Sequence, residues 1–241
     1  IQVQKNQVEI QKKNIALEKI QFENVVTLAL VNVRDQLISL NDGLKELYSN
    51  NGGGSFWYSK NNWLVLDPCT NSWDMISCSD GILTKIDMQA QRMYGSLPSE
   101  VGFITAMTEF HLTSNDLSGS LPSELGSLTA SLVVPWSDNS FTNSLPTQLG
   151  RLTYVTKNIQ LHSNKLSSTI PTEIFNMRLL TSTLDLSNND LKSLLPSQVG
   201  QFTGLKSTFK IRSTQLTGSI PTQIGMLDSL SSALYLDDNQ F

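Results

Sequence analysis

Apolar and polar residues alternate in short stretches that return every 24 or 25 residues from position 86 onward. In each stretch one polar residue separates two apolar residues, and a further apolar residue follows five positions later, as Leu191 follows Leu186. Alternation with a period of two predicts a short β-strand with one buried face. The seven apolar pairs are Ile86/Met88, Phe110/Leu112, Val134/Trp136, Ile159/Leu161, Leu184/Leu186, Phe209/Ile211 and Leu234/Leu236.

A Leu-Pro or Ile-Pro dipeptide follows the first six predicted strands, and the prolines lie 24, 24, 25, 25 and 25 residues apart. A repeat of this length indicates a solenoid, in which each coil buries its apolar edge against its neighbours. Proline fixes φ, so we expect the chain to leave each strand for the convex side at this point. The prolines are Pro98, Pro122, Pro146, Pro171, Pro196 and Pro221.

A polar residue stands three positions after each apolar pair. It is Gln91 in the first unit and Thr214 in the sixth, and asparagine in the other five: Asn115, Asn139, Asn164, Asn189 and Asn239. An amide both donates and accepts hydrogen bonds, so a buried asparagine can satisfy backbone groups of its own coil and of the next. Pro135 lies inside the third predicted strand, where it removes one donor from the ladder.

The combined pattern, L-x-L-x-x-N-x-L, then small residues and L/I-P, resembles the plant-type leucine-rich repeat. The segments LSGSLPSELGSL, LDLSNNDL and LTGSIPTQIGML carry the resemblance, which covers about seven units over residues 82–241. It implies an α/β solenoid, a right-handed superhelix with a parallel β-sheet on its concave face. Two departures predict uneven curvature: units four to seven have one extra residue, and Phe175 stands where other units have glycine.

Residues 34–81 are predicted to form an N-terminal cap that covers the apolar edge of the first coil. A helical stripe of leucines and isoleucine runs through residues 34–48. The stretch NNWLVLDPCTNSWDMISCSDGILTKIDM resembles the caps of plant receptor-kinase ectodomains and polygalacturonase-inhibitor-like proteins, and this resemblance implies a disulfide between Cys69 and Cys78. Free buried cysteines are the alternative. A disulfide indicates an oxidising compartment.

Residues 1–33 are predicted to form a helical extension with apolar residues on two faces. Both rows recur every seven residues, but they are offset by two positions, so they do not form one coiled-coil seam. The helix either lies between partner chains or packs on the cap. For contact with a partner we single out Ile1, Val8, Ile15 and Phe22; the second row is Val3, Ile10 and Leu17.

Composition excludes several classes of function. The net charge is −4 and no stretch of the sequence is a basic stripe, which argues against a nucleic-acid partner. The sequence has no catalytic triad in a plausible frame, no phosphate-binding loop and no metal-ligand spacing, so we expect no enzyme, no cofactor and no metal site. It starts without methionine and stops within a repeat, which suggests an interior fragment that itself spans no membrane.

Polar residues that alternate with the apolar pairs are predicted to point out from the concave face. They carry charges of both signs, which suits a protein or peptide partner; a merely solvated face is the alternative. The predicted partner-binding residues on this face are His111, Asp138, His162, Asp185, Lys210, Arg212, Tyr235 and Asp237.

Two functions are compatible with these patterns. The first is a non-catalytic protein–protein interaction module of a secreted, cell-surface or luminal protein, such as a receptor-like protein. The second is a structural subunit built permanently into a larger assembly through the N-terminal helix and one solenoid face. The sequence has no Asn-x-Ser/Thr glycosylation site. This absence argues against a heavily glycosylated receptor and is compatible with a protein of an organelle lumen.

Overall fold

The computed structural model describes residues 68–70, 73–128, 130 and 133–241. The predicted helical extension of residues 1–33, with Ile1, Val8, Ile15 and Phe22, and the helical stripe of the cap lie outside these residues. The domain boundaries at 33 and 81 therefore stay predictions.

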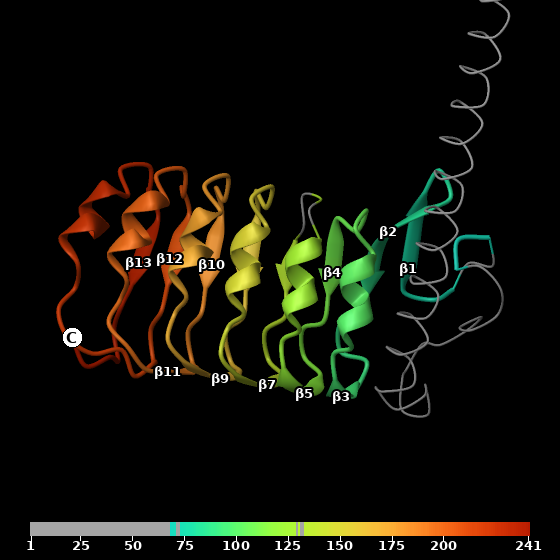
Figure 1. Ribbon diagram of the computed structural model, residues 1–241, viewed down its shortest axis with the longest axis horizontal. Helices are drawn as coiled ribbons and strands as arrows, with labels where there is room; N and C mark the ends of the chain where they lie inside the picture. The colour runs from blue at the N-terminus through green and yellow to red at the C-terminus, as the bar shows by residue number, and fades with distance from the viewer. Residues whose placement is uncertain (1–67, 71–72, 129, 131–132) are drawn as a thin grey trace, which may run out of the picture. The chain divides into compact units, whose positions relative to one another are not determined.

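A ladder of short parallel strands confirms the predicted solenoid (Figure 1). We number the coils 1 to 7 by these strands, which are β2 (Ile82–Asp87), β4 (Glu109–His111), β6 (Val134–Pro135), β8 (Asn158–Gln160), β10 (Thr183–Asp185), β12 (Thr208–Lys210) and β13 (Ala233–Tyr235). A parallel bridge between Glu109 and Val133 links β4 to β6. Before the ladder, β1 (Ile76–Ser79) pairs antiparallel with β2.

The apolar pairs point into the solenoid as predicted. In coils 1 to 6 each member of a pair is at most 3% exposed, whereas Leu234 in coil 7 is 40% exposed. Each neighbouring coil removes these side chains from water, which favours stacking by roughly 1.5–3 kcal/mol for each large side chain before ordering costs. The handedness of the superhelix stays a prediction.

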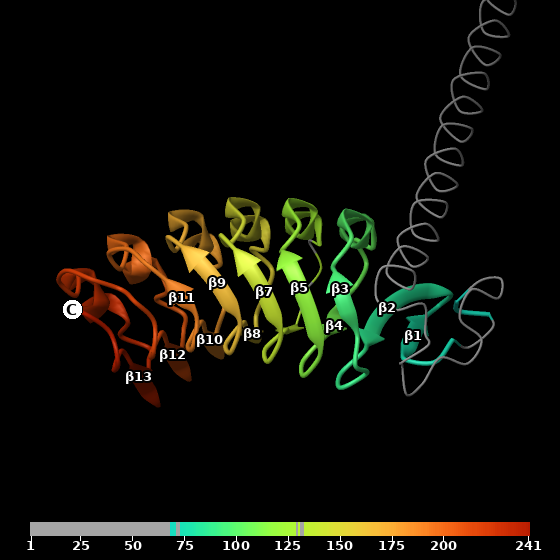
Figure 2. The same cartoon turned by 90° about the horizontal axis from the view of Figure 1, so that it is seen from below.

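A second parallel sheet, which the sequence pattern did not predict, follows the asparagine position of coils 1 to 5 (Figure 2). Its strands are β3 (Tyr94–Ser96), β5 (Asp116–Ser120), β7 (Ser140–Asn143), β9 (Lys165–Ser168) and β11 (Asp190–Leu191). These strands contain one buried apolar residue each at most, such as Leu117, so they show no alternation that a sequence pattern could reveal.

The side opposite the first ladder carries six 3-10 helices: η1 (Ser99–Phe103), η2 (Ser123–Ser127), η3 (Thr147–Arg151), η4 (Thr172–Asn176), η5 (Ser197–Gln201) and η6 (Thr222–Met226). A proline in extended conformation precedes each one. The described residues contain no α-helix, so the α part of the predicted α/β class is wrong for the coils. Each helical segment has only five residues, a length at which 3-10 geometry is common.

Glycine inside these helices allows the coils to approach closely. A Cβ added at Gly102 would lie 2.3 Å from the backbone oxygen of Glu124 in the next coil, so no other residue fits there without a shift. Phe175 occupies the corresponding position in coil 4, where it is fully buried and its ring centre lies 5.1 Å from that of Phe202. At this position an aromatic contact between coils 4 and 5 therefore replaces the close approach that glycine allows in other coils.

A disulfide joins Cys69 to Cys78, which confirms the pairing that the resemblance implied. Cys78 lies in β1 beside the first coil, and Trp73 between the two cysteines in sequence is only 2% exposed. The bridge therefore ties the segment before β1 to the start of the repeats.

Candidate functional site

The asparagines at the turns of coils 2 to 5 and 7 bond to backbone groups of neighbouring coils. Asn164 accepts a hydrogen bond from the amide of Phe141 at 3.0 Å and donates to the carbonyls of Trp136 and Leu161, both at 3.1 Å. Phe141 and Trp136 belong to coil 3, so the asparagine satisfies its own coil and the preceding one. We predicted hydrogen bonds to the next coil, which was wrong, because the turn points the side-chain amide toward the preceding coil.

The residue before each of these turn positions has a left-handed backbone, with φ between 49° and 61°. This conformation turns the chain out of the first ladder, and it is uncommon for residues other than glycine. The seven residues are Ala90, Ser114, Asp138, Ser163, Asn188, Ser213 and Asp238. Asp138 is exposed, so its carboxylate belongs to the turn at the border of the predicted concave face.

Pro135 removes a ladder donor as predicted, and a side chain replaces it. In the parallel register the missing N–H would donate to the carbonyl of Phe110, because Glu109 pairs with Val133. The indole Nε1 of Trp136 donates to that carbonyl instead, at 2.7 Å, and its ring meets the ring of Phe110 edge to face. The ladder therefore continues through coil 3, and the proline ring lies among the outward residues.

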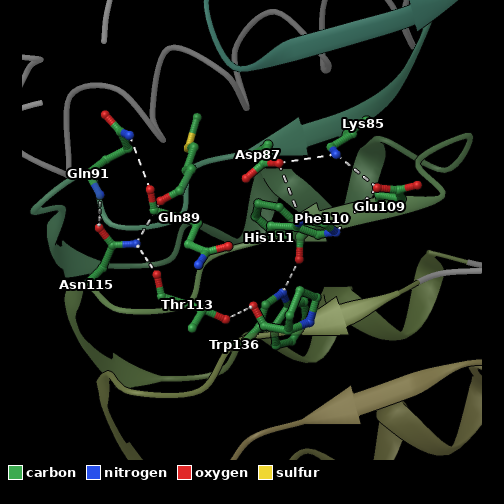
Figure 3. A network of polar contacts seen from close by, with 12 residues as sticks. Lys85, Asp87, Gln89, Gln91, Glu109, Phe110, His111, Thr113, Asn115 and Trp136 are labelled. Carbon is green, nitrogen blue, oxygen red and sulfur yellow. Dashed lines mark hydrogen bonds and ion pairs between the residues drawn. The ribbon is translucent and has the colours of Figure 1, made fainter. Parts of the chain in front are cut away.

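A ring of polar side chains, made of Lys85, Asp87, Glu109 and His111, occupies the first two coils of the face (Figure 3). Lys85 Nζ lies 3.2 Å from Asp87 Oδ2 and 3.1 Å from Glu109 Oε2. His111 Nδ1 lies 3.4 Å from Asp87 Oδ2, and His111 Nε2 lies 3.4 Å from Glu109 Oε2. His111 was predicted to face outward, whereas Lys85 and Glu109 were missed. They stand just before the apolar pairs, and the alternation could have assigned them to the same face.

The two carboxylates raise the pKa of Lys85 above its usual 10.5, through the hydrogen bond to Glu109 first and that to Asp87 second. A raised pKa in the folded state means that the pairing stabilises the fold below pH 10.5 and is lost as the pH rises through the folded value. The lysine is therefore charged at neutral pH, and we expect its contacts with Glu109 and Asp87 to persist there.

A second group of charges lies in coils 5 to 7. Lys210 Nζ lies 3.5 Å from Asp185 Oδ2, and Arg212 lies 3.2 Å from Asp237 and 3.6 Å from Asp238. Lys210 also stands over the ring of Tyr235, at 5.6 Å from its centre. The structure thus gathers five of the predicted residues: Asp185, Lys210, Arg212, Tyr235 and Asp237. Asp185 is only 5% exposed, so it holds Lys210 in place more than it meets solvent.

Uncharged side chains separate the two groups. Pro135 and Gln160 lie next to each other on β6 and β8, and Thr183 of β10 lies beside Asn158. His162 follows β8, and its Nδ1 lies 3.2 Å from the hydroxyl of Ser163. The predicted concave face therefore has charge pairs at both ends and a neutral centre on β6 and β8, which Asp138 borders at the turn of coil 3.

The described residues contain no group of three or more histidine, cysteine or acidic side chains placed to hold a metal ion. None of the helices in the described part of the chain has the length and apolar content of a membrane span.

Two segments of the chain match a known repeat family, and solved structures share the architecture. The family described as Leucine Rich Repeat matches residues 106–128 and 181–202. A solved complex of PEPR1 with AtPEP1 is 25% identical, with a TM-score of 0.69, and the match covers 83% of this chain and 28% of that one.

Two further structures are similar. The ectodomain of the receptor kinase GASSHO1/SCHENGEN3 from Arabidopsis thaliana, in complex with CASPARIAN STRIP INTEGRITY FACTOR 2, is 28% identical with a TM-score of 0.59; the match covers 63% of this chain and 18% of that one. The plant peptide hormone receptor RGFR1 in complex with RGF2 is 27% identical with a TM-score of 0.50, over 64% and 28%. The chain thus spans less than a third of these proteins.

Proposed function

We propose that this chain, whose coils are leucine-rich repeats, binds a protein or peptide partner on its predicted concave face and catalyses no reaction. The observation that carries the proposal is the arrangement of outward side chains. Two groups of paired charges flank a neutral centre, and no two coils present the same set of residues. Such a surface distinguishes partners by charge and shape at several points.

The charged side chains on this face are held in place before a partner arrives. Lys85, Glu109 and His111 are fixed by mutual contacts, and Asp185 and Tyr235 both contact Lys210. Side chains that are already ordered lose less conformational entropy on binding, which favours affinity. Arg212 and Tyr235 are also partly exposed, and arginine and tyrosine are common anchors of protein interfaces.

The similar structures support a peptide or protein partner. One is a plant peptide hormone receptor bound to its ligand, and another is a receptor-kinase ectodomain bound to an integrity factor. Because this chain matches only a part of those proteins, their partners are not carried over to it.

The disulfide supports a place outside the reducing cytosol. Bridges of this kind form and persist in secreted proteins, at the cell surface and in oxidising lumens. We therefore assign the chain to the extracellular space or cell surface, with an organelle lumen as the alternative.

Affinity capture with matched variants tests the proposal. The chain is immobilised and partners from native material are identified by mass spectrometry, for the wild type and for Lys210→Glu/Arg212→Glu. The control is Lys165→Glu/Lys192→Glu, which reverses two exposed cations near the second sheet. We expect a protein that is captured by the wild type and the control and is lost with the Lys210/Arg212 variant. Equal capture by all three would refute binding on this face.

A structural subunit is the second candidate, and the two apolar rows of residues 1–33 favour it. Deleting this segment should then leave the repeats folded and abolish association with the assembly, because each buried apolar side chain contributes about 1.5–3 kcal/mol before ordering costs. Replacing Ile1 and Val8, or Ile15 and Phe22, by aspartate should have the same effect. Full association of the truncated, folded chain would remove this candidate.

A further inference from the structure

The segments that lead from the 3-10 helices back to the first ladder form a surface apart from the predicted concave face. We call the segments 151–157, 176–182 and 201–207, at the ends of coils 3 to 5, the return edge. They follow the same backbone course, since Val155 donates to the carbonyl of Leu152, Leu180 to that of Met177 and Leu205 to that of Phe202. Figure 1 shows such segments side by side along its upper border.

Backbone hydrogen bonds hold the three segments against one another. The amide of Thr181 donates to the carbonyl of Thr156 at 3.0 Å, and that of Lys206 to Thr181 at 2.9 Å. Equivalent points of neighbouring coils therefore stand close to one strand spacing apart here, about 4.8 Å. Side chains that are far apart in sequence become neighbours on this edge.

The return edge concentrates positive charge that no ion pair in the described residues neutralises, although Glu173 lines the same surface hollow as Arg151. Its four basic side chains are Arg151, Lys157, Arg178 and Lys206; all are exposed, and none has an ion-pair partner in the described ranges. The three segments contain no aspartate or glutamate. In coil 6 the position of Arg178 is taken by Asp228, where the basic surface ends. The chain as a whole has a net charge of −4, so this surface opposes its overall sign.

Two large apolar side chains lie exposed among these cations. Tyr154 is 59% and Leu179 is 51% exposed, at equivalent positions of adjacent coils. The other described coils have small residues at this position: Ala106, Ala130, Gly204 and Ser229. Exposed single apolar residues are common, but an adjacent pair at a position otherwise occupied by small residues, in segments that also carry four exposed cations, has the composition of a contact site.

We propose that the return edge of coils 3 to 5 binds an acidic segment of a partner protein that carries an apolar side chain. Carboxylates of the segment pair with the four cations, which also attract it from a distance, and its apolar side chain covers Tyr154 and Leu179. Four cations offer few phosphate contacts for a nucleic acid, and two apolar side chains bury little area in a lipid surface. A peptide of mixed acidic and apolar residues fits both features.

Fluorescence anisotropy with a synthetic probe tests this site on the full chain. The probe is a labelled peptide of repeated Glu-Glu-Leu units, and a Lys-Lys-Leu peptide controls for sign. We expect saturable binding of the acidic probe that weakens with added salt. Arg151→Glu/Arg178→Glu should lower the affinity at least about tenfold, because it reverses half of the charge. Tyr154→Ser/Leu179→Ser should lower it several-fold, and Lys165→Glu/Lys192→Glu should leave it unchanged.

Several results would overturn the site. These are the absence of saturable binding, equal binding of the basic peptide, and an equal loss in the Lys165/Lys192 variant. Tighter binding of phosphatidylserine vesicles or of a single-stranded oligonucleotide, lost in Arg151→Glu/Arg178→Glu, would show that the occupant is wrong. Arg151→Gln/Arg178→Gln removes the charges without reversing them, so a variant that fails to fold does not end the test. The site is independent of partner binding on the predicted concave face.

Discussion

The inward and outward sides of the first ladder differ, although the same strands build both. Inward positions repeat one chemistry, large apolar residues that are at most 3% exposed through coil 6. Outward positions change from coil to coil: Asp87, His111, Pro135, Gln160, Asp185, Lys210 and Tyr235 occupy one row. Neighbouring coils constrain the inward side chains through packing, whereas outward side chains meet solvent and each other. In the proposed function, folding and recognition are therefore carried by different residues of the same strands.

The largest expected effect comes from Trp136→Phe, which removes an inward donor. The carbonyl of Phe110 would lose its partner and the smaller ring would leave space, so we expect a loss of about 2–4 kcal/mol in the free energy of unfolding. Chemical denaturation measures it. Pro135→Ala in the same chain restores a backbone N–H to that carbonyl and should return about 1 kcal/mol. A double variant no more stable than Trp136→Phe would mean that this hydrogen bond does not stabilise the ladder.

The next largest effect is expected for Asn164→Ala. It should lower the free energy of unfolding by about 1–3 kcal/mol, because it leaves buried groups of coils 3 and 4 without partners. Asn176→Ala is the control. Asn176 is exposed, and we expect a change below about 0.5 kcal/mol. Asn188 is a poor control, since its φ of 53° makes alanine unfavourable there for a separate reason. Similar losses of stability for Asn164→Ala and Asn176→Ala would mean that the hydrogen bonds of Asn164 do not stabilise the fold.

Thr214→Asn should increase stability, because it places an asparagine at the turn position of coil 6, as in most other coils. The hydroxyl of Thr214 donates to the carbonyl of Ile211 and lies against Asn239, and no described contact of this side chain reaches coil 5. Asparagine there can accept from the amide of Leu191, as Asn189 accepts from Leu166. We expect a gain of about 0.5–1.5 kcal/mol and slower amide hydrogen exchange at Leu191. Unchanged exchange at Leu191 would show that the bond between the coils does not form.

The smallest effect on stability is expected on the outward side. Lys210→Ala/Arg212→Ala removes partly exposed ion pairs with Asp185, Asp237 and Asp238, and such pairs contribute about 0–1 kcal/mol. We expect a shift of that size in the denaturation midpoint. A loss as large as that of Asn164→Ala would contradict the separation of folding from recognition.

The sequence predicted the features that repeat inward. Alternating pairs such as Leu184/Leu186 gave the first ladder, and the turn position with Asn164 gave the hydrogen-bonding residue. The second sheet escaped prediction, since hydrogen bonds between coils define it and its side chains carry no periodic signal. The direction of the Asn164 bonds depends on the turn geometry, which a residue pattern does not contain.

The surfaces were predicted only in part, for a related reason. Alternation assigned Lys210 and Arg212 to the outward side but could not show that Asp185 is buried beneath Lys210. The cations of the return edge lie in three separate segments of the sequence, so no basic stripe was visible before the coils were stacked. The cap disulfide came from the family resemblance, because two cysteines alone leave free thiols as an alternative.

Photo-crosslinking tests the central claim, that a partner lies on the predicted concave face, most directly. A photoreactive amino acid is placed at Gln160, in the neutral centre of the face, and in a second chain at Ser167 on the second sheet. After irradiation in native material, we expect one protein joined to the chain through residue 160 and none through residue 167. Crosslinks of equal yield from both positions, or from residue 167 alone, would contradict the account.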